Sequence, residues 1–423
     1  MALTYIGSIT LNVNEKNLTA GVVDGDFIYY GIDGNPGGVV KVQMSTFTRT
    51  GSILYSDTTN ETYSSDIQVV GSHVYTAHGS IGNKRIVKVT TAALSRIGAL
   101  TTTELPVALI SDGTDLYYGG PDVDIGIVNQ ASKIKKVSVS SFTETATLTV
   151  AETGYFYGYG TTHYDAARNL LYFFNTEDDS PFTTKLVRVS STSFTEQSSL
   201  NYTGNTFNTQ SNVAGDYLFI TLFEDSPTII YKLNLDSFTQ VASKSLKATD
   251  AAGWNMLVQG EFLYIVTDTQ LIKFRVSTLE RVDEVSFSVS SSAGWTIHSD
   301  GGSNFFVGTY EDPAKVIKIS DAGPTFLANR ISIPHRIVSI GGVIVIRADS
   351  GLTGTSAVVV GATSATDFTV VNDQTLRVTI PAGVSTGSNA VQVTTGTGTV
   401  TVPGDICVLG ASGYAGQMGT HSC

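Results

Sequence analysis

Aromatic side chains at repeated positions are the residues of this sequence with the clearest chemical meaning. Two Ala-Gly-Trp triplets place Trp254 and Trp295 each 22 residues after a lysine, Lys232 and Lys273, and the same offset in an earlier copy gives Tyr63. Aromatic rings stack on sugar rings and anchor interfaces, so these are candidate binding residues. For any one of them, packing between structural units is the more ordinary interpretation. A Gly- and Tyr-rich stretch adds Tyr155, Tyr157 and Tyr159 to the candidates.

Patterns typical of catalysis or metal binding are missing from the sequence. The six histidines form no His-x-x-x-His pair and do not recur at a fixed period. The acidic clusters lack EF-hand spacing and indicate solvated loop charge; they lie at 122–124, 177–179, 224–225 and 311–312. Neither a Gly-x-Ser-x-Gly motif nor a phosphate-binding loop is present. We therefore predict no catalytic residue, no metal ligand and no cofactor, and a protein that is not an enzyme.

The charge balance narrows the class of partner. The chain carries 25 Lys and Arg against 37 Asp and Glu, a net charge of -12. Nucleic-acid binding needs clustered basic residues that displace counterions, so we expect neither nucleic acid nor an anionic membrane as a partner. No apolar run reaches the roughly 18 residues of a membrane helix. With 41% hydrophobic and 15% charged residues, the chain also lacks the composition of a disordered protein.

An internal repeat predicts the elements that would position the aromatic residues. A basic residue between apolar neighbours, with Lys135 replacing one of them in the third copy, recurs every 41 to 52 residues, at Lys41, Lys88, Lys136, Arg188, Lys232, Lys273 and Lys318. In six copies a Phe or Leu follows six residues later: Phe47, Leu94, Phe142, Phe194, Phe238 and Leu279. Upstream, turns such as Asp24-Gly25-Asp26 precede strands rich in Tyr and Phe. Each copy therefore predicts four short strands joined by tight turns.

Seven four-stranded units resemble a seven-bladed β-propeller. A solenoid is the alternative, but equal units with alternating patterning favour a closed ring. Residues Leu3–Ile9 match Phe47–Ile53 at Thr, Gly, Ser and Ile, whereas the seventh copy lacks the usual fourth-strand spacing. We expect the N-terminal strand to complete the seventh blade, in the velcro closure of many propellers, which protects the edge strands. The propeller is predicted over residues 1–333.

The repeat stops near Ile333, and a second pattern follows. The segment Leu376-Arg377-Val378-Thr379-Ile380-Pro381-Ala382-Gly383 and the Val- and Thr-rich strands around it resemble an IPT/TIG domain, a small immunoglobulin-like β-sandwich. We assign residues 334–402 to this sandwich and residues 403–423 to a Gly-rich tail, packed on its own domain or held by a neighbouring subunit. The two cysteines, Cys407 and Cys423, either close one terminal loop or remain free thiols.

The predicted fold class is thus all-β: a seven-bladed propeller with an N-terminal velcro strand, followed by an immunoglobulin-like sandwich. IPT/TIG domains mostly mediate binding or spacing, often in cell-surface and bacteriophage proteins. The N-terminus has no basic and apolar leader pattern. Our leading hypothesis is a non-enzymatic decoration or fibre protein on a bacteriophage virion surface. It would contact other virion proteins through residues 334–423 and display the propeller to a host glycan or protein. The alternatives are an extracellular or cell-surface bacterial adhesin, and a propeller enzyme acting on a polysaccharide or lactone in the channel.

Overall fold

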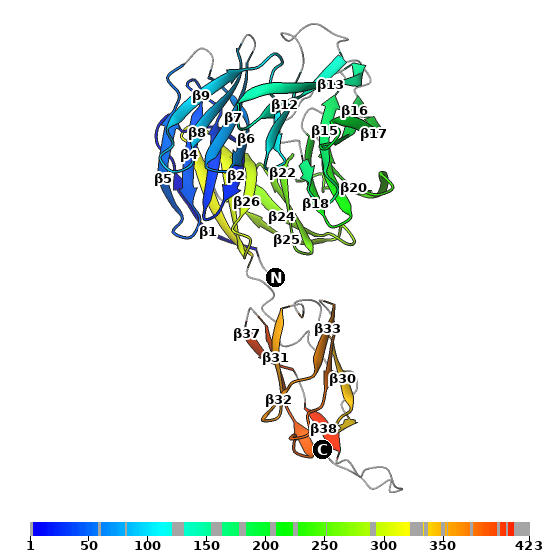
Figure 1. Ribbon diagram of the computed structural model, residues 1–423. Helices are drawn as coiled ribbons and strands as arrows, with labels where there is room; N and C mark the ends of the chain where they lie inside the picture. Colours follow the sequence, from blue (N-terminus) through cyan, green and yellow to red (C-terminus); the bar gives the residue numbers. More distant parts are fainter. Residues whose placement is uncertain are drawn as a thin grey trace. The chain divides into compact units, whose positions relative to one another are not determined.

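The computed structural model is an all-β protein that divides into two compact units, Ala2–Asp321 and Ala322–Cys423 (Figure 1). Among the described residues, no helix is long and apolar enough to cross a membrane. The described residues are 3–57, 61–80, 83–120, 131–153, 163–176, 183–203, 209–222, 227–250, 252–287, 293–321, 333, 337–347, 352, 354–372, 375–395, 398–402 and 405–409.

The first unit is built from four-stranded antiparallel sheets, and its described residues form seven of them, here numbered in chain order. Sheets 1 and 2 contain β2 (Leu18–Asp24), β3 (Phe27–Ile32), β4 (Gly38–Gln43), β5 (Thr48–Leu54), β6 (Ser64–Val70), β7 (His73–Ser80), β8 (Asn83–Thr90) and β9 (Arg96–Thr101). Sheets 3 and 4 contain β10 (Ala108–Ser111), β11 (Asp115–Gly120), β12 (Ala131–Ser138), β13 (Thr143–Thr153), β14 (His163–Asp165), β15 (Leu170–Thr176), β16 (Thr183–Ser190) and β17 (Thr195–Thr203). Sheets 5 and 6 contain β18 (Thr209–Ala214), β19 (Tyr217–Leu222), β20 (Ile229–Asn234), β21 (Thr239–Ser245), β22 (Gly253–Gln259), β23 (Phe262–Thr267), β24 (Gln270–Arg275) and β25 (Arg281–Ser286). Sheet 7 contains β26 (Ala293–Ser299), β27 (Asn304–Tyr310), β28 (Lys315–Asp321) and, from the other end of the unit, β1 (Leu3–Thr10).

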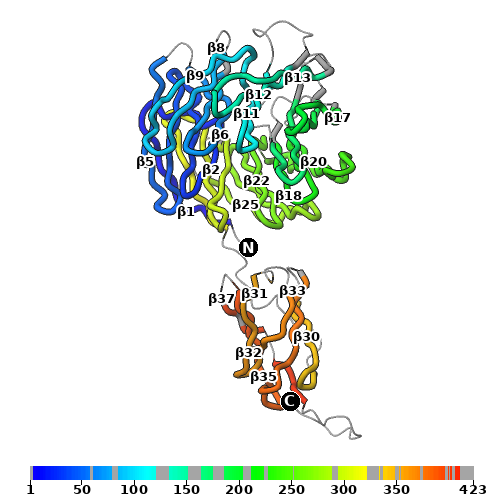
Figure 2. The backbone as a smooth tube through the Cα atoms, in the orientation of Figure 1, coloured from blue at the N-terminus to red at the C-terminus, as the bar shows by residue number. Residues whose placement is uncertain are grey.

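The sheets follow one another in a cycle. The first strand of each sheet contacts the first strand of the next, from β2 to β26, and β26 in turn contacts β2. The blue and yellow segments therefore lie side by side although they are distant in sequence (Figure 2). Large apolar side chains fill the space between successive sheets; Tyr30 of sheet 1, for example, packs with Phe306 of sheet 7. The first strands are thus the innermost ones, and the fourth strands lie outside.

Strand β1 completes sheet 7 by antiparallel pairing with β28. Lys318 pairs with Gly7, and Ile6 is an extra, bulged residue. Sheet 1 has the same register, with Lys41 paired to Gly51 and a bulge at the next position. The N-terminal strand therefore pairs where its sequence match to β5 placed it.

The Phe or Leu that follows each basic residue has an unusual backbone. All six such residues have φ between 49 and 55°, in the left-handed region that is costly for a side chain with a Cβ. The side chains are nevertheless retained, because they pack between sheets: Phe238 belongs to the cluster of Tyr172 and Leu186, and Leu279 to that of Phe219 and Phe274. The repeated Phe or Leu therefore marks the turn before the fourth strand, and its packing between sheets stabilises that turn.

The repeated basic residues have a shared partner as well. In every sheet the basic group lies within 6 Å of the centre of an aromatic ring, at distances such as 3.8 Å from Lys273 Nζ to Phe262. Several of these groups also donate to the next sheet: Lys41 Nζ to the Thr91 carbonyl oxygen at 2.8 Å, and Lys232 Nζ to that of Val276 at 3.0 Å. The repeated basic residues thus help to join neighbouring sheets.

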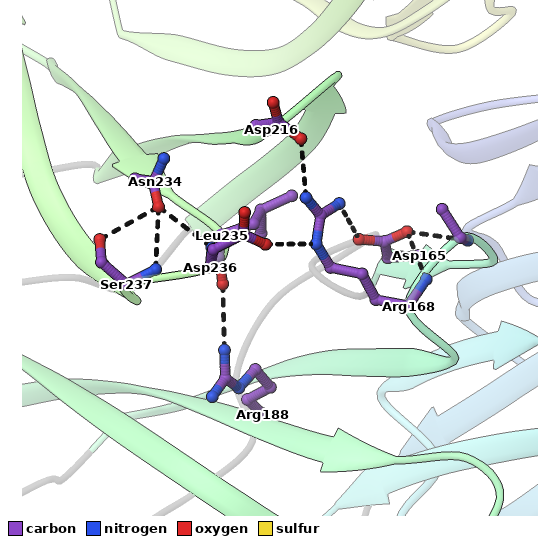
Figure 3. Close-up of polar contacts among 9 residues, drawn as sticks. Asp165, Arg168, Arg188, Asp216, Asn234, Leu235, Asp236 and Ser237 are labelled. Atoms are coloured by element: carbon purple, nitrogen blue, oxygen red, sulfur yellow. Dashed lines mark hydrogen bonds and ion pairs between the residues drawn. The ribbon is translucent and has the colours of Figure 1, made fainter.

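A charged cluster joins sheets 4 and 5 on the side of the first turns (Figure 3). The guanidinium of Arg168 lies 3.1 Å from Asp165, 2.8 Å from Asp216 and 2.9 Å from Asp236. Hydrogen bonds to these carboxylates raise the pKa of Arg168 further above its usual range. Arg188 adds a bond of 3.0 Å to the carbonyl oxygen of Leu235. Because one cation serves three loops, the cluster is a structural clamp.

The second unit has one core between short sheets. Its strands are β29 (Ile337–Ser339), β30 (Val343–Arg347), β31 (Thr355–Val360), β32 (Thr363–Ala365), β33 (Phe368–Asn372), β34 (Thr375–Thr379), β35 (Gly387–Asn389), β36 (Val391–Thr395), β37 (Gly398–Thr401) and β38 (Ile406–Leu409). They pair in the orders β30-β34-β33, β32-β31-β36-β37 and β29-β38-β35. Buried Val, Ile and Leu side chains from all three groups form a single cluster.

The boundaries of the second unit differ from those expected. The chain divides after Asp321 instead of after residue 333, because Ile333 packs into the second core. Within the segment 403–423, expected to be a tail, β38 pairs with β29 and β35, whereas residues 403–404 and 410–423 lie outside the described residues. Apolar residues 406–408 are buried there, which explains why this part does not behave as a Gly-rich tail. Cys407 is disulfide-bonded, and Cys423 lies outside the described residues.

Candidate functional site

Two β-bulges place the tryptophans at one end of the innermost strands. On β22, Gly253 pairs with Thr267 and Asn255 with Val266, so Trp254 is the extra residue. On β26 the same shift makes Trp295 the extra residue. A bulge changes the direction of the side chain that it adds. Each indole therefore departs from the alternation of side chains between the two faces of its strand. The two tryptophans are therefore equivalent in the structure as well as in the sequence repeat.

The two indoles and a tyrosine form a stack, which we call the aromatic column: Trp254, Trp295 and Tyr310. The ring centres of Trp254 and Trp295 are 4.2 Å apart with 19° between the planes, and those of Trp295 and Tyr310 are 4.8 Å apart. The indole Nε1 of Trp254 donates to Asp268 Oδ1. Tyr310, at the end of β27, keeps 39% of its surface exposed. The column thus presents apolar ring surface to solvent while its polar tips have partners.

A carboxyl group of sheet 1 borders the column. The Tyr310 hydroxyl donates to Asp33 Oδ2 at 3.3 Å, and Asp33 Oδ1 has no hydrogen-bond partner among the described residues. Burial raises the pKa of Asp33 to about 6, although the bond from Tyr310 and the charge of Lys16 oppose this. Asp33 is therefore an acceptor with unused capacity at the edge of an aromatic surface.

Tyr63 lies close to this group but is not equivalent to the tryptophans. Its backbone N–H donates to the Gly34 carbonyl oxygen at 3.1 Å, and its ring is 49% exposed. The bulged residue of β6 is Ser65, which is buried and bonds the Pro106 carbonyl oxygen. The loop before β6 differs in length from the loops before β22 and β26. Counting 22 residues from Lys41 therefore reaches Tyr63 and not the bulged residue, Ser65.

The structure thus brings three of the six predicted residues to one end of the ring, on sheets 2, 6 and 7. Tyr155, Tyr157 and Tyr159 lie outside the described residues. Sequence reasoning missed Tyr310 and Asp33. The hairpin register of sheet 7 offers a signal for Tyr310, which faces Ala293 beside Trp295. No local pattern marks Asp33, because it reaches the column from another sheet.

Apart from the aromatic column, a cavity of about 200 Å³ lies on the axis of the ring. Its described lining comes from the first strands of six sheets, which defines it as the central channel. The polar lining residues include Asp66, Gln68, His163, Ser211, Asn255 and His298. Gly21 allows the close approach of His298, because a Cβ there would collide with the imidazole.

The channel acid is held by backbone amides. Asp66 Oδ1 accepts from the N–H of Ile67 at 2.7 Å, and Oδ2 from the N–H of Leu109 on the next sheet at 2.8 Å. Burial raises the pKa of Asp66 to about 7, although these two bonds oppose the rise. Burial also lowers the pKa of His163 and of His298 to about 4, so both imidazoles are neutral at pH 7.

The remaining charged candidates are paired or not described. In the cluster 311–312, Lys315 lies 3.0 Å from Glu311 and Lys16 lies 3.6 Å from Asp312, so salt bridges balance charge expected to be free in solvent. The clusters 122–124, 177–179 and 224–225 lie outside the described residues. Within the described part of the chain, no group of three or more His, Cys, Asp or Glu is arranged to hold a metal ion.

Comparisons with known proteins extend the description of the fold. No protein-family model and no curated protein sequence matches the chain. Among solved structures, the chain is similar to hydrazine synthase of Kuenenia stuttgartiensis, with a TM-score of 0.55 and 12% identity. The alignment covers 71% of this chain and 94% of that chain. At this identity the likeness concerns the fold alone, and it supports a β-propeller-like all-β architecture.

Proposed function

We propose that the first unit is a closed seven-bladed β-propeller with the N-terminal strand as its velcro closure, and that the second is an immunoglobulin-like sandwich of the IPT/TIG type. The cyclic contacts of the first strands and the pairing of β1 with β28 support the ring. The single core shared by three short sheets supports the sandwich. Each blade then supplies its inner strand to the channel, and the rim that carries the column is formed by the starts of the inner strands and the ends of the second strands.

On this architecture, we propose that the protein is a non-enzymatic glycan-binding protein and that the aromatic column is its binding surface. The observation that carries this proposal is the stack of Trp254, Trp295 and Tyr310 beside Asp33. Sugars present apolar C–H faces and hydroxyl groups together. Aromatic rings match the first, and the hydroxyl of Tyr310, which donates to Asp33 and keeps its acceptor position, matches the second.

The parts of the site have separate roles in this binding mode. The exposed ring surface of the column receives one sugar face, and the Tyr310 hydroxyl, which donates to Asp33, accepts a hydrogen from a sugar hydroxyl. Tyr63, half exposed and next to Gly34, extends the surface over the next blade. Such a surface suits an extended chain of several sugar units, because the aromatic residues come from sheets 6, 7 and 2, with Asp33 of sheet 1 between the last two. Nothing in this mode requires bond cleavage.

For the biological setting, we propose a bacteriophage virion, with residues 334–423 docked on other virion proteins and the propeller turned to the host. The resemblance of the second unit to a domain used in phage structural proteins supports this placement. Imaging of the native assembly tests it. Ordered contacts between residues 334–423 and a capsid or tail protein are expected, whereas a chain found only as a free or cell-wall-attached protein would favour the adhesin alternative.

Glycan binding is tested with an array of bacterial surface polysaccharides, followed by calorimetry on each hit. Trp295→Ala removes the central ring of the column and is expected to weaken binding by about 1–3 kcal/mol, the range for an aromatic contact at an interface. Val241→Ala is the matched control, because Val241 is exposed on the outer strand β21. Equal affinity of the wild type and a folded Trp295→Ala protein would exclude the column as the site.

A further inference from the structure

Two carboxyl groups are bonded directly to the aromatic column, one at each end of the stack. Asp33 accepts a hydrogen bond from the Tyr310 hydroxyl at 3.3 Å, and Asp268 accepts one from the indole nitrogen of Trp254. Neither group forms a salt bridge within the described part of the chain. Asp33 is ionised at pH 7, since its pKa of about 6 lies below this value. The column therefore lies between two negative charges that no salt bridge balances.

The basic residues beside Tyr310 already have acidic partners. Glu311 and Asp312 follow Tyr310 directly in the chain. Lys315 lies 3.0 Å from Glu311, and Lys16 lies 3.6 Å from Asp312. An anionic ligand would have to compete with these carboxylates for either lysine, so neither lysine is a free cation for it.

The Tyr63 side of the rim shows the same balance. Arg85 lies 3.0 Å from Asp57 and 3.5 Å from Glu61, and Arg96 also forms an ion pair with Glu61. These four charges cancel, so this group adds no excess positive charge near the column.

The charge distribution selects the class of glycan. Ring faces suit any sugar chain, but the excess charge of Asp33 and Asp268 repels another anion, most strongly beside an apolar ring surface where water screens it less. The indole rings are 4.2 Å apart and leave no gap between them for a cation, so the stack is not an ammonium cage. We propose, on the basis of the glycan binding described above, that the column binds uncharged sugar chains and excludes chains that carry carboxylate or phosphate groups.

Two pairs of sugar hexamers, each pair with one backbone and two charge states, test this selection. The galacturonic acid hexamer is compared with its uncharged methyl ester, and the N-acetylglucosamine hexamer with its anionic N-succinyl derivative. Calorimetry on the full chain at pH 7 is expected to show the uncharged member binding at least about tenfold more tightly in each pair that binds. The uncharged member is the larger one in the first pair and the smaller one in the second, so size does not produce this order. Equal or tighter binding of the anionic member would overturn the inference but leave glycan binding intact, whereas no binding by any hexamer would contradict both.

Variants assign the selection to the column. Asp268→Asn removes one charge but keeps an oxygen that accepts from the Trp254 nitrogen. It is expected to reduce the affinity ratio between uncharged and anionic hexamers at least about threefold, because one of two repelling charges is lost. Asp24→Asn is the matched control, since Asp24 is exposed at the end of β2 beside the first turn, and it changes the net charge equally without changing the ratio. An equal change of the ratio in both variants would attribute the selection to net charge and overturn the inference.

A salt series on the wild type needs no substitution, so it decides the point even if Asp268→Asn misfolds. Salt screens repulsion between charges near solvent, so the affinity ratio is expected to fall between about 0.02 and about 0.5 M sodium chloride. A ratio independent of salt would show that shape and not charge separates the two chains, and would overturn the inference.

Discussion

At the scale of single residues, the repeat combines a costly backbone with a well-packed side chain. Phe47, Leu94 and their equivalents hold a left-handed φ that glycine would adopt freely, yet each copy keeps a large apolar group. The side chain remains because it fills the space against the next sheet. Periodicity in the sequence located these residues, but their backbone conformation was not predictable, because Phe and Leu are poor markers of a positive φ.

Leu279 gives a direct test of this balance. Leu279→Ala is expected to lower the free energy of unfolding by about 2–5 kcal/mol, because the side chain is 2% exposed. Leu279→Gly is expected to cost no more than the alanine variant, because glycine releases the roughly 1 kcal/mol of left-handed strain. The control is Leu263, buried in β23, where glycine should be worse than alanine. Denaturant unfolding of the four variants decides the point; glycine worse than alanine at both positions would contradict it.

The raised pKa of Asp33 predicts a pH dependence of stability. The folded protein holds this proton up to about pH 6, whereas the unfolded chain releases it near the ordinary aspartate pKa of 3.8. The native state thus binds more protons between these values, and stability falls as pH rises through them. Relative to Asp33→Asn, the wild type should lose about 2 kcal/mol between pH 4 and pH 7. Urea unfolding across this range measures the difference, and parallel profiles would show that Asp33 titrates normally.

At the scale of elements, the sequence predicted the strands better than it predicted which side chains meet at the strand ends. The match of Leu3–Ile9 to the fourth strand of sheet 1 was sufficient to place β1, because a strand in a repeat inherits its register. Trp254 and Trp295 were paired for the same reason. Asp33 was not found, because its approach to Tyr310 depends on how two sheets turn about the axis, and one sequence does not encode that angle locally.

The bulge in β1 predicts opposite behaviour for two nearby residues. Leu3 is 7% exposed in the core between sheets 6 and 7, whereas Ile6 is the bulged residue and is 53% exposed. Leu3→Asp is expected to destabilise by more than about 3 kcal/mol, since it buries a charge. Ile6→Asp should stay within about 0.5 kcal/mol of the wild type. Thermal unfolding of both variants tests the register, and a large loss in Ile6→Asp would indicate that β1 pairs differently.

At the scale of the whole molecule, the chain consists of two units with separate cores. The composition and the end of the repeat predicted this division, but not its position. Ile333 continues the apolar pattern of the seventh repeat in sequence, yet it packs with Ile344 and Val378 of the second unit. A single apolar residue suits either core, so only the packing itself distinguishes them.

Independent cores predict independent folding. A chain ending at Asp321 is expected to remain folded and to keep the glycan affinity of the column within about twofold, because the column lies in the first unit. Scanning calorimetry of the full chain should then show the transition of the shorter chain plus a second one. Loss of the folded state on truncation would show that the second unit is required by the first.

The pairing of β1 with β28 also affects the order in which the protein can be made. Strand β1 is made before the rest of its unit and has no partner until β28 has been synthesised, whereas the other sheets are formed by neighbouring segments. Closing so long a loop adds little free energy, since the cost grows only logarithmically with length, but it slows folding. Until then the nascent chain carries open strand edges that invite aggregation. A chain that ends before β28 therefore cannot close its ring, whereas a chain that includes β28 can.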